Sequence, residues 1–541
     1  MTEQKRKADL DVLIVGAGFA GMYMLYRTRK LGLKGRVFER GDGVGGTWYW
    51  NRYPGARCDV ESMQYSMQFD PDLEQEWEWT ERYAPQPEIL DYANHIADRY
   101  GLRPDIRLEC PVRAAHFDED SGLWRVTVGD GNGHGEELTA RFVVMATGCL
   151  SQPNKPEVEG MADFRGPIYH TGEWPRDGVD FTGQTVGVIG TGSSAIQSIP
   201  IIAEQAKHLT VFQRTPNYAV PAHNGPIDQE MVQQVKANYR ELRQKAKTMP
   251  AGIAFDLRDV SAFDADDAER RHQFQSRWDY GGLTFLGCFN DLLLDEDANR
   301  FAADFVRERI REIVDDPETA EMLCPDNIIG CKRLCVDTGY YRTYNRDNVE
   351  LVDISGTPVE RLTETGLSVG GKDYAFDAIV FATGFDAMTG ALLNIDIRGR
   401  AGQRLSNKWD GGPRNYLGLS MHGFPNMFTV TGPGSPSVLT NMLPSIEQHV
   451  EWIAECIDYM DRNGKALIEP EPAAEDTWVD HVNDVAGTSL RSTCSSWYVG
   501  ANVPGKPRVF MPYIGGFPAY AEKCRDVVEK GYEGFRLSGA A

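Results

Sequence analysis

The chain has 541 residues, which is too long for one hydrophobic core and predicts roughly two to four domains. Its hydrophobic (41%) and charged (25%) fractions are typical of a soluble globular protein, and a formal net charge of −23 argues against nucleic acid or an anionic membrane as a partner. No apolar run is long enough to span a bilayer, and Met1–Lys7 lacks the apolar core of a signal peptide. We therefore expect a cytoplasmic protein with no membrane partner.

The first expected unit is a strand, a glycine-rich turn and a helix near the start of the chain. The apolar run 12–15 predicts a buried parallel strand, and residues 22–30 predict a helix. In a dinucleotide-binding turn, the first glycine permits the tight bend, the second lets the backbone approach a pyrophosphate, and the third allows close packing of helix on strand. The turn here contains Gly16, Gly18, Phe19 and Gly21.

An acidic residue ends the next expected strand. Residues 36–39 form a strand-like run that finishes at Glu39, which is placed to accept hydrogen bonds from an adenosine ribose. A glycine-rich turn without a ligand is the alternative. Strand, turn, helix, strand and terminal acid occur together here, and this combination predicts a dinucleotide site with the pyrophosphate at the helix N-terminus.

A second unit of the same kind follows. The buried-type strand 185–189 leads into a turn, and a further strand is expected over 209–212. Where an NAD site would carry an acid after that strand, this chain carries Arg214 and Thr215, which favours a 2′-phosphate and therefore NADP. A solvated surface charge is the alternative for Arg214. The turn contains Gly190, Gly192, Ser193 and Ser194, with Ala195 in place of the third glycine.

Two similar short segments predict where the chain crosses between domains. Residues 145–148 and 381–384 share the sequence Ala-Thr-Gly, and each follows an apolar, strand-like run. We therefore predict an α/β fold with two Rossmann-like dinucleotide-binding domains, the first of them discontinuous. The expected parts are a first domain of 1–148 and 384–541, a second of 149–221 and 331–383, and a helical insertion of 222–330.

Three helices are expected outside the dinucleotide units, and two of them lie in the insertion. The first would be capped by Asp228 and would present one face made of Met231, Val232, Val235, Tyr239 and Leu242. The second has a stripe made of Phe301, Phe305, Val306, Ile310 and Ile313. We expect both stripes to pack against the domain core. A third helix, late in the chain, would begin at a capping box formed by Ser445 and Gln448.

The ten cysteines contain no CxxC pair. The spacing of Cys331 and Cys335 fits neither a zinc site nor a redox motif, so we expect reduced, buried or half-buried thiols and no metal site. The missing CxxC also argues against a flavin disulfide reductase, another family with two dinucleotide folds.

The segment between the two turns carries a specific pattern. It matches FxGxxxHxxxWP in full, through Phe164, Gly166, His170, Trp174 and Pro175. With this fingerprint the chain resembles the type I Baeyer–Villiger monooxygenases, in particular the branch of phenylacetone and steroid monooxygenases. Similarity to that family extends over essentially the whole chain, including 45–59, Lys332–Arg333, Trp497 and 500–506.

The resemblance implies two cofactors and a reaction. NADPH would reduce FAD, the reduced flavin would react with O₂, and a flavin C4a-peroxide would convert a ketone into an ester or lactone. Arg333 would stabilise the anions of this reaction because a guanidinium stays charged and offers several donors, and Asp59 would hold it. By the same resemblance Lys332 joins Arg214 and Thr215 at the NADP phosphate.

The resemblance also assigns Trp497 to the nicotinamide side and Thr47 and Trp48 to the flavin. From the residues alone, Lys332 and Arg333 are surface charges by default and Asp59 is a turn residue. Trp48 and Trp50 have core aromatics as their alternative. For His170 we favour a linker role between the two dinucleotide units, with an ordinary packed or capping histidine as the alternative.

A loop over 434–442 corresponds to a substrate pocket in the resembling enzymes. Its expected pocket residues are Ser437, Val438 and Leu439, and aryl, cyclic and polycyclic ketones all remain open as substrates. Oxygenation of nitrogen or sulfur nucleophiles and a non-oxygenating NADPH sensor are the competing functions. We expect a monomer or weak oligomer that takes a small ketone and O₂ and binds no nucleic acid.

Overall fold

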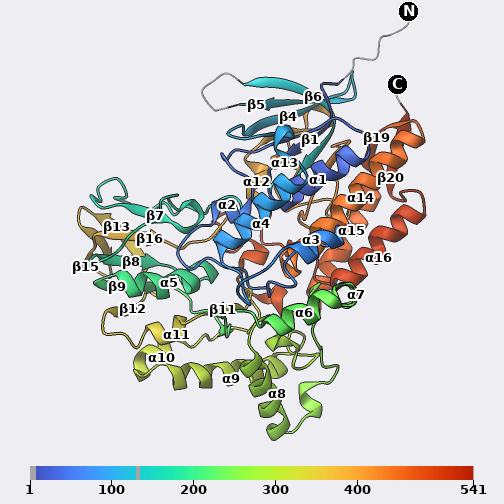
Figure 1. The fold of residues 1–541 in the computed structure, drawn as a ribbon. Coiled ribbons are helices and arrows are strands. Elements are labelled where there is room, and N and C mark those ends of the chain that lie inside the picture. The colour runs from blue at the N-terminus through green and yellow to red at the C-terminus, as the bar shows by residue number, and fades with distance from the viewer. Residues whose placement is uncertain (1–7, 130–134, 540–541) are drawn as a thin grey trace, which may run out of the picture.

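The computed structural model describes residues 8–129 and 135–539, so the expectation about Met1–Lys7 lies outside the described residues. Two sheets organise the chain (Figure 1). The first combines early and late parts of the sequence, because β17 and β18 return to pair with β4 and β6. In spatial order its strands are β17 (Asp396–Arg398), β4 (Val112–Asp118), β5 (Leu123–Val128), β6 (Glu136–Met145), β1 (Leu10–Val15), β2 (Gly35–Phe38) and β3 (Ile106–Arg107), with β18 (Met427–Thr429) on β6.

The second sheet is wholly parallel. Its strands Thr185–Ile189 and Ala378–Phe381 are apolar and almost wholly buried, as expected for the centre of a sheet covered on both faces. In order they are β12 (Val349–Asp353), β9 (His208–Gln213), β8 (Thr185–Ile189), β16 (Ala378–Phe381) and β7 (Ile168–His170). A small antiparallel sheet beside it consists of β13 (Val359–Thr363), β14 (Gly366–Val369) and β15 (Lys372–Ala375).

The fold is the expected α/β arrangement, with a helix after the first strand of each dinucleotide unit. Helix α1 (Phe19–Lys30) follows β1 and packs against α14 (Met442–Arg462), and helix α5 (Ser193–Gln205) follows β8. Further helices are α2 (Thr47–Trp50), α3 (Pro71–Glu76), α4 (Gln86–Arg99), α11 (Tyr340–Thr343), α12 (Gly390–Leu393), α13 (Leu405–Lys408), α15 (Pro472–Gly487) and α16 (Phe517–Glu529). Within the described residues, no helix combines the length and the apolar character needed to cross a bilayer.

The helical insertion is framed by a short parallel pair, β10 (Ala219–Pro221) with β11 (Cys335–Asp337). The insertion runs from the end of β10 to the start of β11 in the sequence. Its helices occupy the lower part of Figure 1, in green and yellow. Its helices are α6 (Gln229–Ala237), α7 (Tyr239–Thr248), α8 (Asp267–Tyr280), α9 (Glu296–Ile313) and α10 (Pro317–Leu323).

The two predicted stripes in the insertion have different outcomes. The α9 stripe is confirmed, because Phe305, Val306 and Ile310 are buried in the core of the second sheet. The first stripe is wrong as a single face: the chain breaks at Asn238 between α6 and α7, and Met231 is 41% exposed. Its remaining members pack against the core of the first sheet, which only the tertiary arrangement could decide.

The late helix is confirmed, but its predicted start is wrong. Helix α14 begins at Met442, and the side chain of Asn441 caps it by accepting a hydrogen bond from the Leu443 N–H. The Ser445 hydroxyl lies 2.6 Å from Thr440 Oγ1 and is used there. The helix therefore begins about one turn before the predicted capping box.

The expectation of reduced thiols is wrong at one position. Cys331 is paired in a disulfide with Cys494, with their Cα atoms 5.7 Å apart, whereas Cys335 is a free buried thiol. The two partners are 163 residues apart in sequence, so no local spacing could reveal them. The bond joins the segment before Lys332 to the segment before Trp497.

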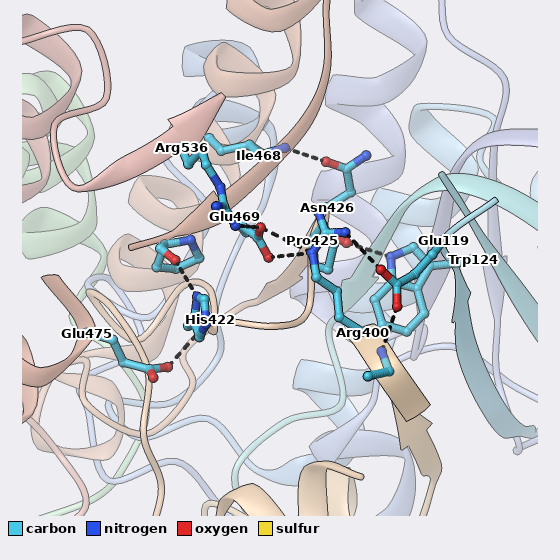
Figure 2. A network of polar contacts seen from close by, with 12 residues as sticks. Glu119, Trp124, Arg400, His422, Pro425, Asn426, Ile468, Glu469, Glu475 and Arg536 are labelled. Atoms are coloured by element: carbon cyan, nitrogen blue, oxygen red, sulfur yellow. Dashed lines mark hydrogen bonds and ion pairs between the residues drawn. The ribbon is translucent and has the colours of Figure 1, made fainter. Parts of the chain in front are cut away.

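Buried acids fasten the returning part of the chain (Figure 2). Glu469, on β19 (Lys465–Pro470), accepts hydrogen bonds from Arg400 Nε at 3.0 Å and from Arg536 on β20 (Phe535–Gly539). Nearby, Glu475 pairs with Lys408 at 2.6 Å. Each acid therefore has a cation within hydrogen-bonding distance, and loss of either partner would leave a buried charge unpaired. None of these residues lines the large cavity of the molecule.

Candidate functional site

One cavity of about 2050 Å³ receives both glycine-rich turns. Strands β1 and β8 point their carboxyl ends into it, and this is where ligands bind in open parallel sheets. Its lining includes most of the predicted cofactor residues, namely Gly16, Gly18, Phe19, Glu39, Thr47, Trp48, Gly190, Gly192, Ser193, Ser194, Arg214, Thr215, Lys332 and Trp497. Gly21 is absent from the lining because it lies inside α1.

The glycines of the first turn have two different reasons to be glycine. Gly16 has φ +102°, and a Cβ on Gly21 would lie 1.8 Å from the Gly16 carbonyl oxygen, so the fold itself demands both. A Cβ on Gly18 would meet only Gly46, at an ordinary 3.4 Å. Protein packing therefore does not by itself require glycine at position 18, and the small residue leaves the backbone open to the close approach of a ligand.

The second turn repeats this division. Gly190 has φ +114°, and a Cβ there would lie 2.6 Å from the carbonyl oxygen of Ala382. A Cβ on Gly192 would have nothing within 4 Å. Helix α5 begins at the next residue, Ser193, so its free N–H groups and dipole face an open space that suits a phosphate.

Glu39 is buried at the end of β2, where it also stabilises the first turn. Its carboxylate accepts hydrogen bonds from the backbone N–H of Ala17 at 2.9 Å and of Gly41 at 2.8 Å. Each oxygen keeps a further lone pair, and the residue lines the cavity. The predicted ribose contact is therefore compatible with the geometry, alongside a structural role.

Two cations converge on the cavity without an acidic partner. Burial lowers the pKa of Lys332, and the positive charge of Arg214 lowers it further, so the two side chains repel each other. Within the described residues neither forms an ion pair with a carboxylate, although the neighbouring residue, Arg333, does. Like charges held together in this way indicate an anion site, and a phosphate would relieve the repulsion. The side chain of Thr191 donates to the carbonyl oxygen of Thr215 at 2.8 Å and fixes the end of β9 beside them.

Arg333 and Asp59 form the ion pair expected from the sequence. The guanidinium donates from Nη2 to Asp59 Oδ1 at 2.8 Å, from Nε to the other carboxylate oxygen, and from Nη1 to the Val438 carbonyl oxygen at 2.6 Å. Burial by itself would lower the pKa of Arg333, but the adjacent carboxylate outweighs it and raises the pKa above its ordinary value. The side chain is therefore a permanent cation fixed at the cavity wall.

The aromatic residues assigned to the cofactors also face the cavity. Trp48, on α2, donates from Nε1 to the hydroxyl of Tyr65 at 2.9 Å. Trp497 lies on a short 3₁₀ turn with its ring 4.3 Å from that of Tyr498. The following loop is anchored by Asn502, which donates to the Phe385 carbonyl oxygen at 2.7 Å. The anchored loop thus forms one wall beside the predicted nicotinamide position.

The fingerprint residues lie outside the cavity lining. His170 accepts the Gly172 N–H at Nδ1 (3.0 Å), and its Nε2 lies 3.1 Å from Thr383 Oγ1, which donates to a backbone carbonyl. Burial lowers the pKa of His170, which therefore stays neutral and ties the fingerprint to the crossing after β16. A Cβ on Gly166 would lie 2.5 Å from the Asp377 carbonyl oxygen. The remaining fingerprint side chains are Phe164 and Trp174, which are buried in hydrophobic cores, and Pro175.

Of the three predicted substrate-pocket residues, Val438 lines the cavity, whereas Ser437 and Leu439 do not. Val438 lines the cavity and its carbonyl holds Arg333. Ser437 is fully buried and donates instead to the Thr431 carbonyl oxygen at 3.0 Å, and Leu439 packs in a neighbouring apolar cluster. The residues alternate around a tight 3₁₀ turn, so adjacent side chains point in different directions.

Sequence reasoning missed Gln197, a buried residue of α5 that lines the cavity. It bonds across to the segment that leads to Asp59. Its position one helical turn after Ser193 was the only local signal, because its partners Arg57 and Tyr53 lie 140 and 144 residues earlier.

Comparison with known proteins agrees with this site. Residues 13–250 match the family model of pyridine nucleotide-disulphide oxidoreductases. The chain is 41% identical over 535 residues to a phenazine N-monooxygenase of Lysobacter antibioticus, covering 98% of this chain and 97% of that protein. It is likewise 41% identical over 529 residues to a Baeyer–Villiger monooxygenase of Pseudooceanicola batsensis (97% and 96%).

Among solved structures, oxidised steroid monooxygenase bound to NADP superposes with a TM-score of 0.93 at 51% identity, covering 98% of this chain and 99% of that one. Identity at this level over nearly the whole length, together with the cavity that holds both turns and the Arg333–Asp59 pair, establishes the family. This chain belongs to the Baeyer–Villiger monooxygenases.

Proposed function

We propose that the chain is an FAD- and NADPH-dependent monooxygenase that inserts one oxygen atom of O₂ into a ketone and releases an ester or lactone. The observation that carries this proposal is the Arg333–Asp59 pair at the wall of the cavity that both dinucleotide turns enter. The Baeyer–Villiger monooxygenase and steroid monooxygenase relatives support it. Bound FAD and NADPH would supply the reducing equivalents and the activation of oxygen.

Each cofactor has a set of residues that fits it. FAD would be held by the first turn and the wall near α2, through Gly16, Gly18, Phe19, Gly21, Glu39, Thr47 and Trp48. NADPH would be held by the second turn and the convergent cations, through Gly190, Gly192, Ser193, Ser194, Arg214, Thr215 and Lys332, with Trp497 on the nicotinamide side. The room for a Cβ at Gly18 and the open space at Gly192 support this assignment, because no protein atom requires those positions to be small.

Arg333 is the residue to which we assign stabilisation of negative charge on the substrate oxygen. Conversion of a ketone carbonyl into a tetrahedral adduct places a full negative charge on that oxygen. A guanidinium already fixed beside it stabilises this charge as it develops. Asp59 holds two of the guanidinium nitrogens and the Val438 carbonyl holds the third, so the cation cannot swing away. Val438 would also contact the ketone.

A panel of aryl, cyclic and polycyclic ketones, with products identified by mass, tests the proposal. We expect NADPH consumption stimulated by at least one ketone and a product heavier by one oxygen atom. The panel includes a phenazine and a thioether, because a phenazine N-monooxygenase is among the relatives. Oxygenation of those compounds without any ester would replace the proposal with heteroatom oxygenation.

The division into a discontinuous first domain (1–148 and 384–541), a second domain (149–221 and 331–383) and an insertion (222–330) is part of the proposal. Sheet membership supports it, since the first sheet draws on residues 10–145 and 396–429 and the second on 168–381. The cytoplasmic location and the monomeric or weakly oligomeric state stay predictions.

A further inference from the structure

The side chain of Gln197 makes three hydrogen bonds that connect the two dinucleotide units. Its Oε1 accepts hydrogen bonds from the Tyr53 hydroxyl at 2.8 Å and from the Arg57 N–H at 3.4 Å, and its Nε2 donates to the Arg57 carbonyl oxygen at 3.1 Å. All three partners lie on a segment that follows α2, whereas Gln197 lies on the helix that begins at the second turn. The side chain is 5% exposed, so water does not compete for these bonds.

The backbones meet at the same place. Gly55 has φ +78°, and a Cβ on it would lie 2.2 Å from the carbonyl oxygen of Gln197. The segment can therefore approach α5 this closely only because residue 55 is glycine. Side-chain bonds and backbone contact together leave the segment little freedom to slide along the helix.

The same segment carries Asp59 to the site. Arg57 is anchored on its other side by Glu81, at 2.9 Å, so the segment is held between the first unit and α5. Two residues further on, Asp59 holds Arg333, which comes from the chain after the insertion. Gln197 thus binds the segment 53–59 at Tyr53 and Arg57, and Arg333 binds it at Asp59. Both contacts come from the NADP side of the cavity.

We propose that Gln197 is a positioning residue that sets the alignment of the second turn on the flavin-side segment. This inference rests on the proposed function, since the quantity that the alignment controls is the distance between the two cofactors. The rate of reaction between two bound groups depends strongly on the distance between them. A displacement of about 1 Å can lower that rate about a hundredfold. The phosphate contacts of Arg214 and Lys332 are elsewhere, so affinity for NADPH does not depend on this contact.

Gln197→Met tests the proposal, because methionine keeps the length and volume of the side chain and removes all three hydrogen bonds. Anaerobic reduction of the FAD-loaded enzyme at several NADPH concentrations separates the dissociation constant from the limiting rate of flavin reduction. We expect the limiting rate to fall about tenfold or more while the dissociation constant changes by less than about threefold. The fraction of NADPH that ends as hydrogen peroxide instead of ester should rise.

Gln205→Met is the matched control: it makes the same substitution on the same helix at a residue whose side chain accepts from Phe181 N–H (3.2 Å) within the second unit. It should leave the limiting rate unchanged. Gln197→Glu keeps the acceptor contacts of Oε1 but places its second carboxylate oxygen against the Arg57 carbonyl oxygen, so its limiting rate should also fall. If Gln197→Met does not retain FAD, the same measurements are made on Tyr53→Phe, which removes only the hydrogen bond from the Tyr53 hydroxyl. The expected decrease in the limiting rate is then smaller.

Three outcomes overturn the inference. The first is a limiting rate in Gln197→Met equal to that of Gln205→Met, and the second is a lower unfolding temperature with no change in rate per bound FAD. The third is a wild-type enzyme that NADPH does not reduce, which removes the proposed function together with the inference. A wild-type enzyme that is reduced but forms no ester would contradict only the proposed function, because the rate comparison still decides the role of Gln197.

Discussion

Two groups of basic residues in this protein differ in how their charge is compensated. Around β19 and β20, Arg400 and Arg536 both bond to the buried carboxylate of Glu469 (Figure 2). At the cavity, Arg214 and Lys332 approach each other, and within the described residues neither has a carboxylate partner. Compensated cations stabilise a fold, whereas uncompensated cations beside a cavity are available to a ligand.

Arg333 lies between these extremes. It has a carboxylate partner, Asp59, yet it faces the cavity, and the pair has partial exposure of 27% and 20%. An ion pair kept for stability alone would not need to line a cofactor cavity. The ion pair fixes the direction of the guanidinium, and its position in the cavity wall makes it accessible to a ligand in the cavity.

The largest expected effect is that of Arg333→Ala, which should reduce ester formation by about a thousandfold or more while NADPH is still consumed and hydrogen peroxide is released. Reduction of the flavin does not create the oxyanion whose stabilisation we assign to Arg333, whereas attack on the ketone does. Product analysis beside anaerobic reduction kinetics measures the two steps. Ester formation at near the parental rate would place Arg333 with the structural cations instead.

Arg214→Ala should weaken NADPH by about ten- to hundredfold, since a lost charge-assisted phosphate contact costs on the order of 1.5–3 kcal/mol. NADH lacks the 2′-phosphate and should be much less affected. Michaelis constants for both cofactors, measured with the same ketone, give the ratio. Equal weakening of both would exclude a 2′-phosphate contact and return Arg214 to a surface charge.

Glu469→Gln should lower the free energy of unfolding by about 1–2 kcal/mol at pH 7, because its cations are partly exposed and can regain water. Burial by itself would raise the pKa of Glu469, but Arg400 and Arg536 outweigh it and lower the pKa below its ordinary value of 4.5. The stabilisation is therefore present above about pH 4.5 and is lost as the pH falls through the folded-state pKa.

Denaturant unfolding at several pH values measures this prediction, and the variant should lose less stability than the wild type between neutral pH and pH 4. Ester formation per folded enzyme should not change, because the network does not line the large cavity. A variant with normal stability but impaired turnover would contradict the division between structural and functional charges.

The smallest effect should come from Arg165→Ala. Arg165 pairs with Glu364 at 2.5 Å, but their side chains are 73% and 64% exposed. Exposed ion pairs contribute little, so we expect a change below about 0.5 kcal/mol in unfolding free energy and none in turnover. A loss comparable to that of Glu469→Gln would show that pairing, and not burial, decides which charges stabilise this fold.

Much of the fold could be predicted from the sequence because its signals are local. The strands predicted at 12–15, 36–39, 185–189 and 209–212 are present, and both glycine-rich turns enter one cavity. A buried strand, a bend that needs glycine and a helix start are all encoded within about thirty residues. The sequence also shows a basic residue, Arg214, where an NAD site would carry an acid. That position can be identified because it follows the strand that comes after the second glycine-rich turn.

Contacts between distant segments could not be predicted in this way. The Cys331–Cys494 bond, the break between α6 and α7, and the inward direction of Ser437 each depend on which surfaces meet after folding. Spacing along the chain contains no record of a partner that lies more than a hundred residues away. The sequence by itself determined the strand, turn and helix of each dinucleotide unit, because these signals are local. Only the tertiary structure decided that Gln197 would bond to the segment leading to Asp59, because that contact exists only where two separately encoded units pack together.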